Sequence, residues 1–377
     1  MLSFRFAVRL LLIALITGLT VPQFAAADVR EDIAAVLKVD HQARNIDLAR
    51  QGVENLQKSG IDALLPILNG LEDANPLAAN YLRNAFETVA SDAVANGQKL
   101  PVEDLLNFVR RTKNRDIARR LAFEWIRKVE PEQAEELIPN FLGDPSAELR
   151  REAVARLLKE AEQMEPNNPG RQSRYLQALS GASDDDQVKK IVAALKDLDV
   201  EVNVQEHYGF LNTWHLIGPF DNRDKKGFDV VYPPENEINL EAEYEGQLGP
   251  VRWQQLQTDD PYGLLNIATD FGPYKGAVVY AYSEFESEYD QPVELRLATP
   301  NAWKIWLNDE LVFEREEYHR GTFFDQYRVP ARLKPGKNKI LIKVLQNEQD
   351  DSWAQVYQIQ FRICQPNGMA LQPAGKE

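Results

Sequence analysis

The spacing of hydrophobic residues changes near residue 205, and this change constrains the fold more than any other feature of the chain. Before it, apolar residues recur with the helical period, as over residues 116–129, where Ile117, Leu121 and Trp125 share one stripe. After it the period is two, as over residues 293–298. A chain of 377 residues also exceeds one simple core. The sequence therefore predicts a helical domain over 28–204 and an antiparallel β domain over 205–364, followed by a flexible C-terminal tail over 365–377.

The helical part repeats at intervals of about 40 residues. Apolar helices end at short Asp- or Asn-containing turns, and a second helix then begins near Pro76, Pro101, Pro131 or Pro145, a position that tolerates a missing backbone N–H. A single helical pair cannot bury its own apolar face, so stacked pairs are expected to form an α-solenoid. The segment 142–157 resembles a HEAT repeat, and the resemblance extends over residues 60–200. An irregular helical bundle is the alternative.

The second part reads as a series of short strands separated by turns. Two short strand patterns, residues 303–307 and 311–313, lie on either side of Asn308-Asp309-Glu310, and this arrangement predicts a hairpin. Lys334-Pro335-Gly336 predicts another turn. About ten such strands without intervening amphipathic helices predict an antiparallel sandwich.

Two of these segments, 303–313 and 333–344, resemble motifs of galactose-binding-like jelly rolls. Segments 214–222 and 227–235 resemble the opening of this domain in secreted planctomycete-type proteins, which often pair it with helical repeats. The resemblance covers residues 210–363 and implies a jelly roll that binds sugar, binds protein or braces its neighbour. It departs at 299–302, where Thr-Pro-Asn-Ala replaces an Asp-Asp-Gly turn. A calcium or sugar-hydroxyl site at that turn is therefore not carried over.

The first 27 residues have the pattern of a secretory signal peptide. Arg5 and Arg9 precede an apolar run over residues 10–21, and Ala25-Ala26-Ala27 supplies small residues before Asp28. We expect cleavage after Ala27 and a secreted or periplasmic protein without a membrane span in its mature chain; an uncleaved anchor is the alternative. Cleavage would change the net charge from −15 to −17, because the segment contains two arginines and no acid.

Composition and motifs argue against several classes of protein. The net charge of −15 disfavours nucleic-acid binding, because phosphates would be repelled. A lone cysteine, Cys364, excludes an intrachain disulfide and is expected to be a buried bystander. His41, His207, His215 and His319 lack metal-ligand spacing, and the common hydrolase and phosphate-binding motifs are missing from the sequence. We therefore expect no catalytic residues, no metal site and no cofactor.

Sugar binding needs aromatic rings beside hydrogen-bonding groups. The candidates lie in predicted loops and on one strand face; they are Trp306, Tyr318, His319, Arg320, Phe323, Phe324, Trp253 and Tyr262. Phe323 and Phe324 are alternatively a plug for the end of the sandwich. In the helical part, basic residues cluster over 110–120 and either receive an acidic partner or are balanced by neighbouring acids; they are Arg110, Arg111, Lys113, Arg115, Arg119 and Arg120.

These observations predict a non-catalytic binding module. Its helical repeats would engage a protein partner, and its sandwich would engage carbohydrate or protein. One alternative is a polysaccharide-active enzyme, or an accessory subunit, with an unrecognised carboxylate pair. The other is a structural envelope scaffold without a small ligand.

Overall fold

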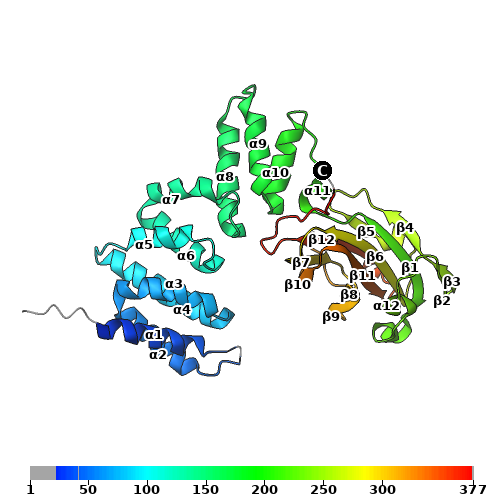
Figure 1. The fold of residues 1–377 in the computed structure, drawn as a ribbon, viewed down its shortest axis with the longest axis horizontal. Coiled ribbons are helices and arrows are strands. Elements are labelled where there is room, and N and C mark those ends of the chain that lie inside the picture. Colours follow the sequence, from blue (N-terminus) through cyan, green and yellow to red (C-terminus); the bar gives the residue numbers. More distant parts are fainter. Residues whose placement is uncertain (1–22, 41, 376–377) are drawn as a thin grey trace, which may run out of the picture. The chain divides into compact units, whose positions relative to one another are not determined.

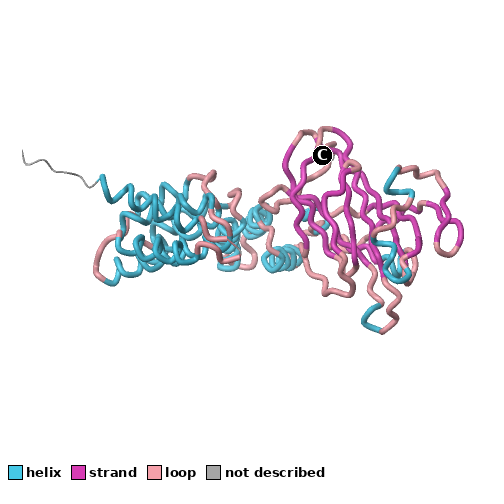
Figure 2. Tube along the Cα trace, turned by 90° about the horizontal axis from the view of Figure 1, so that it is seen from below, coloured by secondary structure: helices cyan, strands magenta, loops and turns pink. Residues whose placement is uncertain are grey.

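The computed structural model describes residues 23–40 and 42–375, with helices in the first part and antiparallel sheets in the second (Figures 1 and 2). The chain forms two compact units, one up to Pro139 and one from Asn140. The predicted signal peptide lies outside the described residues as far as residue 22, and the first described helix begins at Gln23. None of the described helices combines the length and apolar composition needed to cross a bilayer.

The first unit consists of helices that pack on their neighbours in the chain. They are α1 (Gln23–Leu37), α2 (Ile46–Lys58), α3 (Leu64–Gly70), α4 (Pro76–Ala95), α5 (Val102–Arg110), α6 (Asp116–Val129) and α7 (Pro131–Leu137). Helix α1 packs on α2, α3 on α4 and α5 on α6. Pro76 and Pro131 open helices as predicted, and the Asn75 side chain caps α4 by accepting from the backbone N–H groups of Leu77 and Ala78.

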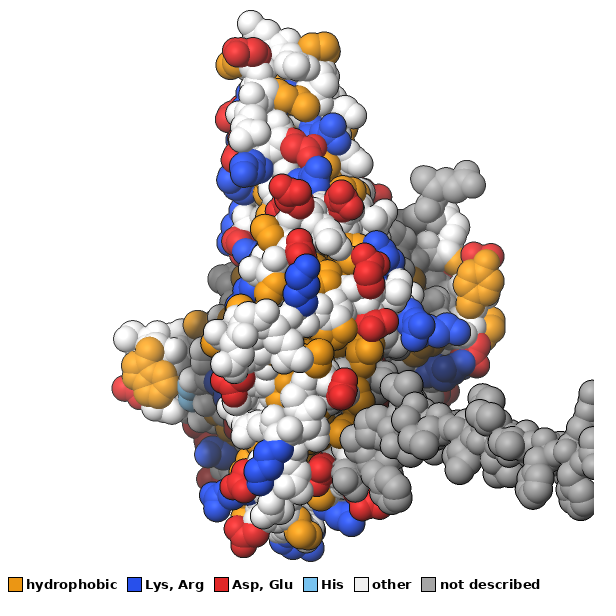
Figure 3. Space-filling model, turned by 90° about the vertical axis from the view of Figure 1, so that its left-hand side faces the viewer, with side chains coloured by type: hydrophobic (Ala, Val, Ile, Leu, Met, Phe, Trp, Pro, Cys, Tyr) orange, Lys and Arg blue, Asp and Glu red, His pale blue; other side chains and the backbone are white. Residues whose placement is uncertain are grey.

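Part of the predicted basic cluster serves the fold of this unit. Arg119 is 1% exposed and donates to the carbonyl of Val109 at 2.8 Å. Arg115 donates to the carbonyls of Leu71 and Ala74, both at 2.7 Å. On the face that Figure 3 draws, basic and acidic side chains are interspersed. The cluster is therefore not a continuous surface of six cations.

The second unit begins with α8 (Ala147–Gln163), α9 (Gly170–Gly181), α10 (Asp185–Lys196) and the short α11 (Val204–Tyr208). Arg150 of α8 is buried and donates to the carbonyl of Asp144 at 2.8 Å, much as Arg119 binds the carbonyl of Val109. These two arginines occupy equivalent positions of the predicted repeat. The HEAT-like solenoid itself stays a prediction.

The strands of the second unit form two large sheets and a small one. They are β1 (Thr213–Asp221), β2 (Glu243–Gly246), β3 (Gly249–Arg252), β4 (Gln254–Gln257), β5 (Leu264–Asn266), β6 (Ala277–Ser287), β7 (Gln291–Ala298), β8 (Ala302–Leu307), β9 (Glu310–Arg315), β10 (Tyr327–Leu333), β11 (Gly336–Gln346) and β12 (Gln358–Cys364). The six-stranded sheet has the order β4-β1-β6-β11-β8-β9 and the four-stranded sheet the order β10-β7-β12-β5. Strands β2 and β3 pair separately, and the strand pairs are antiparallel, as expected.

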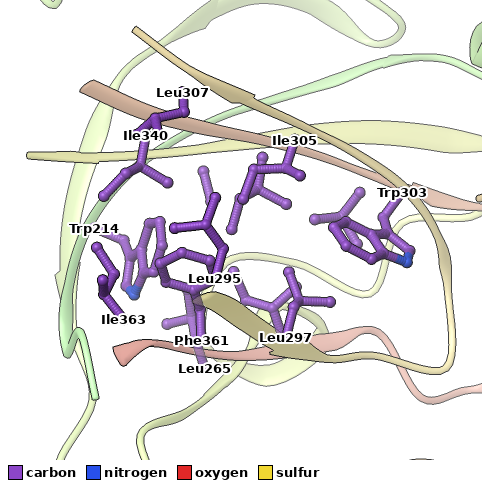
Figure 4. Packing of buried hydrophobic residues seen from close by; sticks show 14 of the residues in the cluster. Trp214, Leu265, Leu295, Leu297, Trp303, Ile305, Leu307, Ile340, Phe361 and Ile363 are labelled. Atoms are coloured by element: carbon purple, nitrogen blue, oxygen red, sulfur yellow. The ribbon is translucent and has the colours of Figure 1, made fainter. Parts of the chain in front are cut away.

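Both large sheets contribute side chains to one hydrophobic core. Trp214, Ile305 and Ile340 come from the six-stranded sheet, and Leu295 and Phe361 come from the four-stranded sheet (Figure 4). Successive residues of a strand point to opposite faces, so each sheet sends alternate residues into this core. Cys364 is also buried, as predicted, and burial raises the pKa of its thiol to about 11. At neutral pH it therefore carries little of the reactive thiolate.

The predicted hairpin joins β8 to β9. Asn308 and Asp309 take the left-handed backbone conformation, with φ of 54° and 70°, which suits a tight hairpin between twisted strands.

Replacing Asp309 by glycine is expected to raise the free energy of unfolding by roughly 0.5–1 kcal/mol, because glycine adopts positive φ without the Cβ penalty. Urea denaturation of wild type and variant measures the difference. The same exchange at Glu310, which begins β9, should destabilise the chain.

A second apolar cluster covers the outer face of the six-stranded sheet. We call residues 222–253, between β1 and β4, the cover segment; its Phe228 and Val251 pack against Tyr280 and Leu341 of the sheet. The cover segment contains the short α12 (Pro233–Asn236) as well as β2 and β3. This face of the sheet is therefore occupied by the chain's own residues.

Helices α8–α10 belong to the same compact unit as the sheets. Their apolar residues share a cluster with Tyr208 and Phe210, against which Tyr262 and Phe324 pack from the β domain. Gly209, between the two buried aromatics, ends α11 with φ of 72°. The boundary between the compact units, after Pro139, therefore does not coincide with the change from helices to strands, which comes before β1.

The segment after Cys364 lies along the β domain. Leu371 donates its backbone N–H to the carbonyl of Ile363 at 3.1 Å, and Ala374 donates to the carbonyl of Glu286 at 2.9 Å. Gln372 donates through its side chain to the carbonyl of Glu206 at 2.6 Å. These bonds hold the described part of the segment predicted to be a flexible tail.

Candidate functional site

Loops after β1, β9 and β11 meet at one end of the β domain. We call the group of Asn222, Lys225, Tyr318, His319, Asn347 and Trp353 the loop-end cluster. Asn222, immediately after β1, is fully buried and donates to the carbonyl of Gln346 at 3.0 Å and to the Tyr318 hydroxyl at 3.2 Å. Its backbone N–H donates to the carbonyl of Gly276, whose own N–H donates to the carbonyl of Asn347. Asn222 therefore fastens three loops together.

Trp353 is the exposed ring of this cluster. Its exposed fraction is 60%, whereas the chain's other tryptophans are buried or half-buried. The ring stands edge-on to His319, with 5.3 Å between ring centroids and an interplanar angle of 87°. His319 has φ of 58°, and its Nε2 lies 2.6 Å from the Asn347 side-chain oxygen. One face of an aromatic ring is thus held beside polar groups at the surface.

Tyr318 and Lys225 lie next to this pair. The centroids of the Tyr318 and His319 rings are 6.4 Å apart, and the Lys225 Nζ lies 5.3 Å from the centroid of Tyr318. Burial raises the pKa of Tyr318 to about 12, so its hydroxyl stays protonated at neutral pH.

Carboxylates near the cluster already have partners. Asp221 binds Arg223 at 2.7 Å, and this hydrogen bond is the main cause that lowers the pKa of Asp221 to about 2. Asp224 binds Lys226 at 2.8 Å, and Glu348 accepts from the backbone N–H of Asp224 at 3.0 Å. A general acid needs a raised pKa, which is opposite to the shift at Asp221.

The structure brings together only some of the predicted sugar-platform residues. Tyr318 and His319 are in the loop-end cluster, and Arg320 pairs with Glu317 beside it. Phe323 is 61% exposed. Its neighbour Phe324 is less exposed, because it packs into the cluster shared with helices α8–α10.

The remaining predicted residues are involved in packing. Tyr262 packs beside Phe324, and its hydroxyl donates to Asp185 of α10 at 2.9 Å. Trp253, at the end of the cover segment, and Trp306 of β8 are half-buried in the apolar cluster between that segment and the sheet. The outer face of the six-stranded sheet therefore offers no open aromatic platform there, because the cover segment occupies it.

The Thr299–Ala302 turn is also structural. Thr299 and Asn301 are buried, and the Asn301 side chain donates to the carbonyl of Val356 at 3.2 Å and accepts from the N–H of Gln358. In the described residues, no group of His, Cys, Asp and Glu side chains is arranged to hold a metal ion.

Sequence reasoning missed Trp353. It follows Asp350-Asp351-Ser352, polar residues between β11 and β12. A tryptophan in a short polar connection is the signal that could have identified it, because such a position offers little apolar surface to cover the indole.

A separate cavity of about 390 Å³ lies beside α11 and the start of β1. Asn212, Thr213 and Ser283 line it, together with Gln372 from the C-terminal segment. Its lining includes none of the predicted sugar-platform residues and no residue of the loop-end cluster.

No protein-family model and no curated protein sequence matches this chain. Solved structures with partial similarity include β-glucosidase from Kluyveromyces marxianus in complex with glucose, with 16% identity over 23% of this chain and 11% of that chain, at a TM-score of 0.20. A family 35 carbohydrate-binding module from an environmental isolate has 14% identity over 30% of this chain and 83% of that chain, also at 0.20. The GH31 α-xylosidase from Xanthomonas citri has 9% identity over 41% of this chain and 16% of that chain, at 0.17. This chain thus spans a small part of the two enzymes.

Proposed function

We propose that this protein is a non-catalytic carbohydrate-binding protein whose sugar site is the loop-end cluster. The exposed indole of Trp353 is the observation that carries the proposal, because the other tryptophans are covered by protein. An indole ring packs against the C–H face of a sugar, and the neighbouring polar groups of His319, Asn347 and Tyr318 supply hydrogen bonds to hydroxyls. The Asn222 bonds fix the loops in advance, which reduces the ordering needed on binding.

Binding is favoured over catalysis by the state of the nearby carboxylates. Asp221 and Asp224 are engaged with Arg223 and Lys226, and the pKa of Asp221 is lowered. This argument supports a binding site and argues against a glycosidase pair at this place. Export to the periplasm or cell exterior, from the signal-peptide pattern, and a protein partner for the helical part, from the predicted repeats, are further parts of the proposal.

Replacing Trp353 by alanine is expected to weaken sugar binding at least about tenfold, because the stacking surface is lost. The measurement is a glycan-array screen of the full chain, followed by calorimetric titration with the best oligosaccharide. Tyr289 is the matched control, because its exposed fraction is 61%. It follows the C-terminal end of β6, whereas the loop-end cluster adjoins the N-terminal end of that strand through Gly276. Tyr289→Ala should bind like wild type. Equal loss in both variants, or binding that does not change in Trp353→Ala, contradicts the proposal.

A further inference from the structure

We infer that the loop-end cluster selects anionic carbohydrate, with Lys225 as the residue that recognises a carboxylate or sulfate group on the sugar. The inference rests on the proposed function and adds the substrate class and the specificity-determining residue. It starts from the ion pairing of three neighbouring cations: Arg223 and Lys226 each pair with a carboxylate, whereas Lys225 does not.

Lys225 lies between two basic residues that are neutralised. Arg223 binds Asp221 at 2.7 Å, and Lys226 binds Asp224 at 2.8 Å. Within residues 23–40 and 42–375, no carboxylate forms an ion pair with Lys225. In a chain with a net charge of −15, this ammonium group is a cation left over for a ligand.

The backbone holds Lys225 in an unfavourable conformation. Asp224 and Lys225 both have left-handed φ, 55° and 60°, and neither is glycine. Two hydrogen bonds maintain the turn: Asp224 donates its N–H to Glu348, and Lys225 donates its N–H to the carbonyl of Asn222. Consecutive residues of this kind persist where the surroundings fix them, and such strain is concentrated at binding sites.

This turn places Lys225 beside the first of three neighbouring aromatic rings. Its Nζ is 5.3 Å from the Tyr318 ring, which lies 6.4 Å from His319, which in turn lies 5.3 Å from Trp353. Each step is comparable to the width of a pyranose ring. Lys225 is thus at most three such steps from Trp353, a span that an oligosaccharide of a few units can bridge.

Tyr318 adds a second donor near the ammonium group. Its hydroxyl accepts a hydrogen bond from Asn222, which leaves its own proton available to a ligand. An ammonium group and a phenol proton together suit an oxyanion better than a neutral hydroxyl. Three acids of the adjoining loops, Asp221, Asp224 and Glu348, already have donors, which limits their repulsion of an anion. The charge of Glu316 also reaches Tyr318 and opposes an anion there.

The test compares three probes on the full chain: a galacturonic acid oligosaccharide, a sulfated galactan oligosaccharide, and the uncharged galactan oligosaccharide of the same length. Lys225→Gln is expected to weaken binding of the charged probes about tenfold or more and to reduce its salt dependence. Binding of the uncharged probe should stay within about twofold of wild type. Lys226→Gln is the matched control, because it removes the same charge one residue away and should leave all three affinities nearly unchanged.

The outcomes separate this inference from the function on which it rests. If the uncharged probe binds as tightly as the charged ones and depends on Trp353, the carbohydrate site stands and the selection of anions is wrong. If Lys225→Gln leaves the affinity for both charged probes unchanged, Lys225 is not the specificity residue. If none of the three probes binds and the glycan array is also negative, both proposals fail. A preference between the galacturonide and the sulfated probe identifies which oxyanion is recognised.

Discussion

Asp325→Asn is expected to lower the free energy of unfolding of the second unit by about 3–5 kcal/mol, because the exchange leaves the buried guanidinium group of Arg362 without its counter-charge and leaves buried Arg296 with Glu294 as its remaining carboxylate. The Asp325 side chain is 6% exposed and accepts from Arg362 through both oxygens, at 2.8 and 2.6 Å. It also accepts from Arg296, which is 7% exposed. Arg362 in turn donates to the carbonyl of Tyr208 and lies over the ring of Phe324.

Urea denaturation followed by tryptophan fluorescence measures this effect, because Trp125 is the one tryptophan outside the second unit. The matched control is Glu317→Gln, which removes an acid that also binds two arginines, Arg315 and Arg320, but at the surface. This control should change stability little. Equal effects of the two substitutions would show that burial of the Asp325 group contributes nothing.

Asp325 should also make stability depend on acid. Burial alone would raise the pKa of Asp325, but the hydrogen bond and charge of Arg362, with the charge of Arg296, outweigh it and hold the pKa below its ordinary value. Its contribution is therefore complete above about pH 4, the ordinary pKa of an aspartate, and is lost as the pH falls through the lower folded-state value. The stability difference between wild type and Asp325→Asn should shrink below about pH 4.

Sequence periodicity anticipated the kinds of elements because burial acts locally along a strand or a helix. The alternation at 293–297 faces a core, and so do Leu121 and Trp125 of the predicted helical stripe, whereas Ile117 is exposed. The Asn308-Asp309 turn joins β8 to β9 as predicted. Trp303 and Trp306 are three residues apart, so period-two alternation correctly assigned them to opposite faces.

Long-range packing could not be predicted in the same way. The cover segment was predicted only as part of the β domain, yet it packs on the outer face of the six-stranded sheet, where Trp306 is half-buried. Phe324 and Tyr262 looked like loop aromatics, yet helices α8–α10 pack against them. Hydrophobic pattern states that a residue will be covered, but it does not state which distant segment covers it. Conversely, the polar residues before Trp353 are a local signal of an exposed indole, but they do not indicate that the ring lies beside His319.

One buried cation, Lys343, binds the cover segment to the sheet. Removing this cation is expected to give the second large decrease in the free energy of unfolding. Lys343 of β11 is fully buried, and its Nζ donates to the carbonyls of Phe228 and Val230, at 3.2 and 2.7 Å, and to Glu235 at 2.8 Å. Burial lowers the pKa of Lys343, whereas the hydrogen bond that Lys343 donates to Glu235 opposes this change.

Lys343→Met should therefore lower the free energy of unfolding by about 3–5 kcal/mol, because the Glu235 carboxylate is left buried without its cation and two carbonyls lose their donor. Limited proteolysis should then cut the cover segment, at residues 222–253, before the strands. Lys339→Met on the same strand is the control, since Lys339 is exposed and its one ion pair with the described residues is to Asp309. Adding Glu235→Gln to Lys343→Met should recover part of the loss, because the double variant has no unpaired buried charge. If Lys343→Met keeps wild-type stability and its cover segment stays resistant to protease, apolar packing alone holds that segment on the sheet.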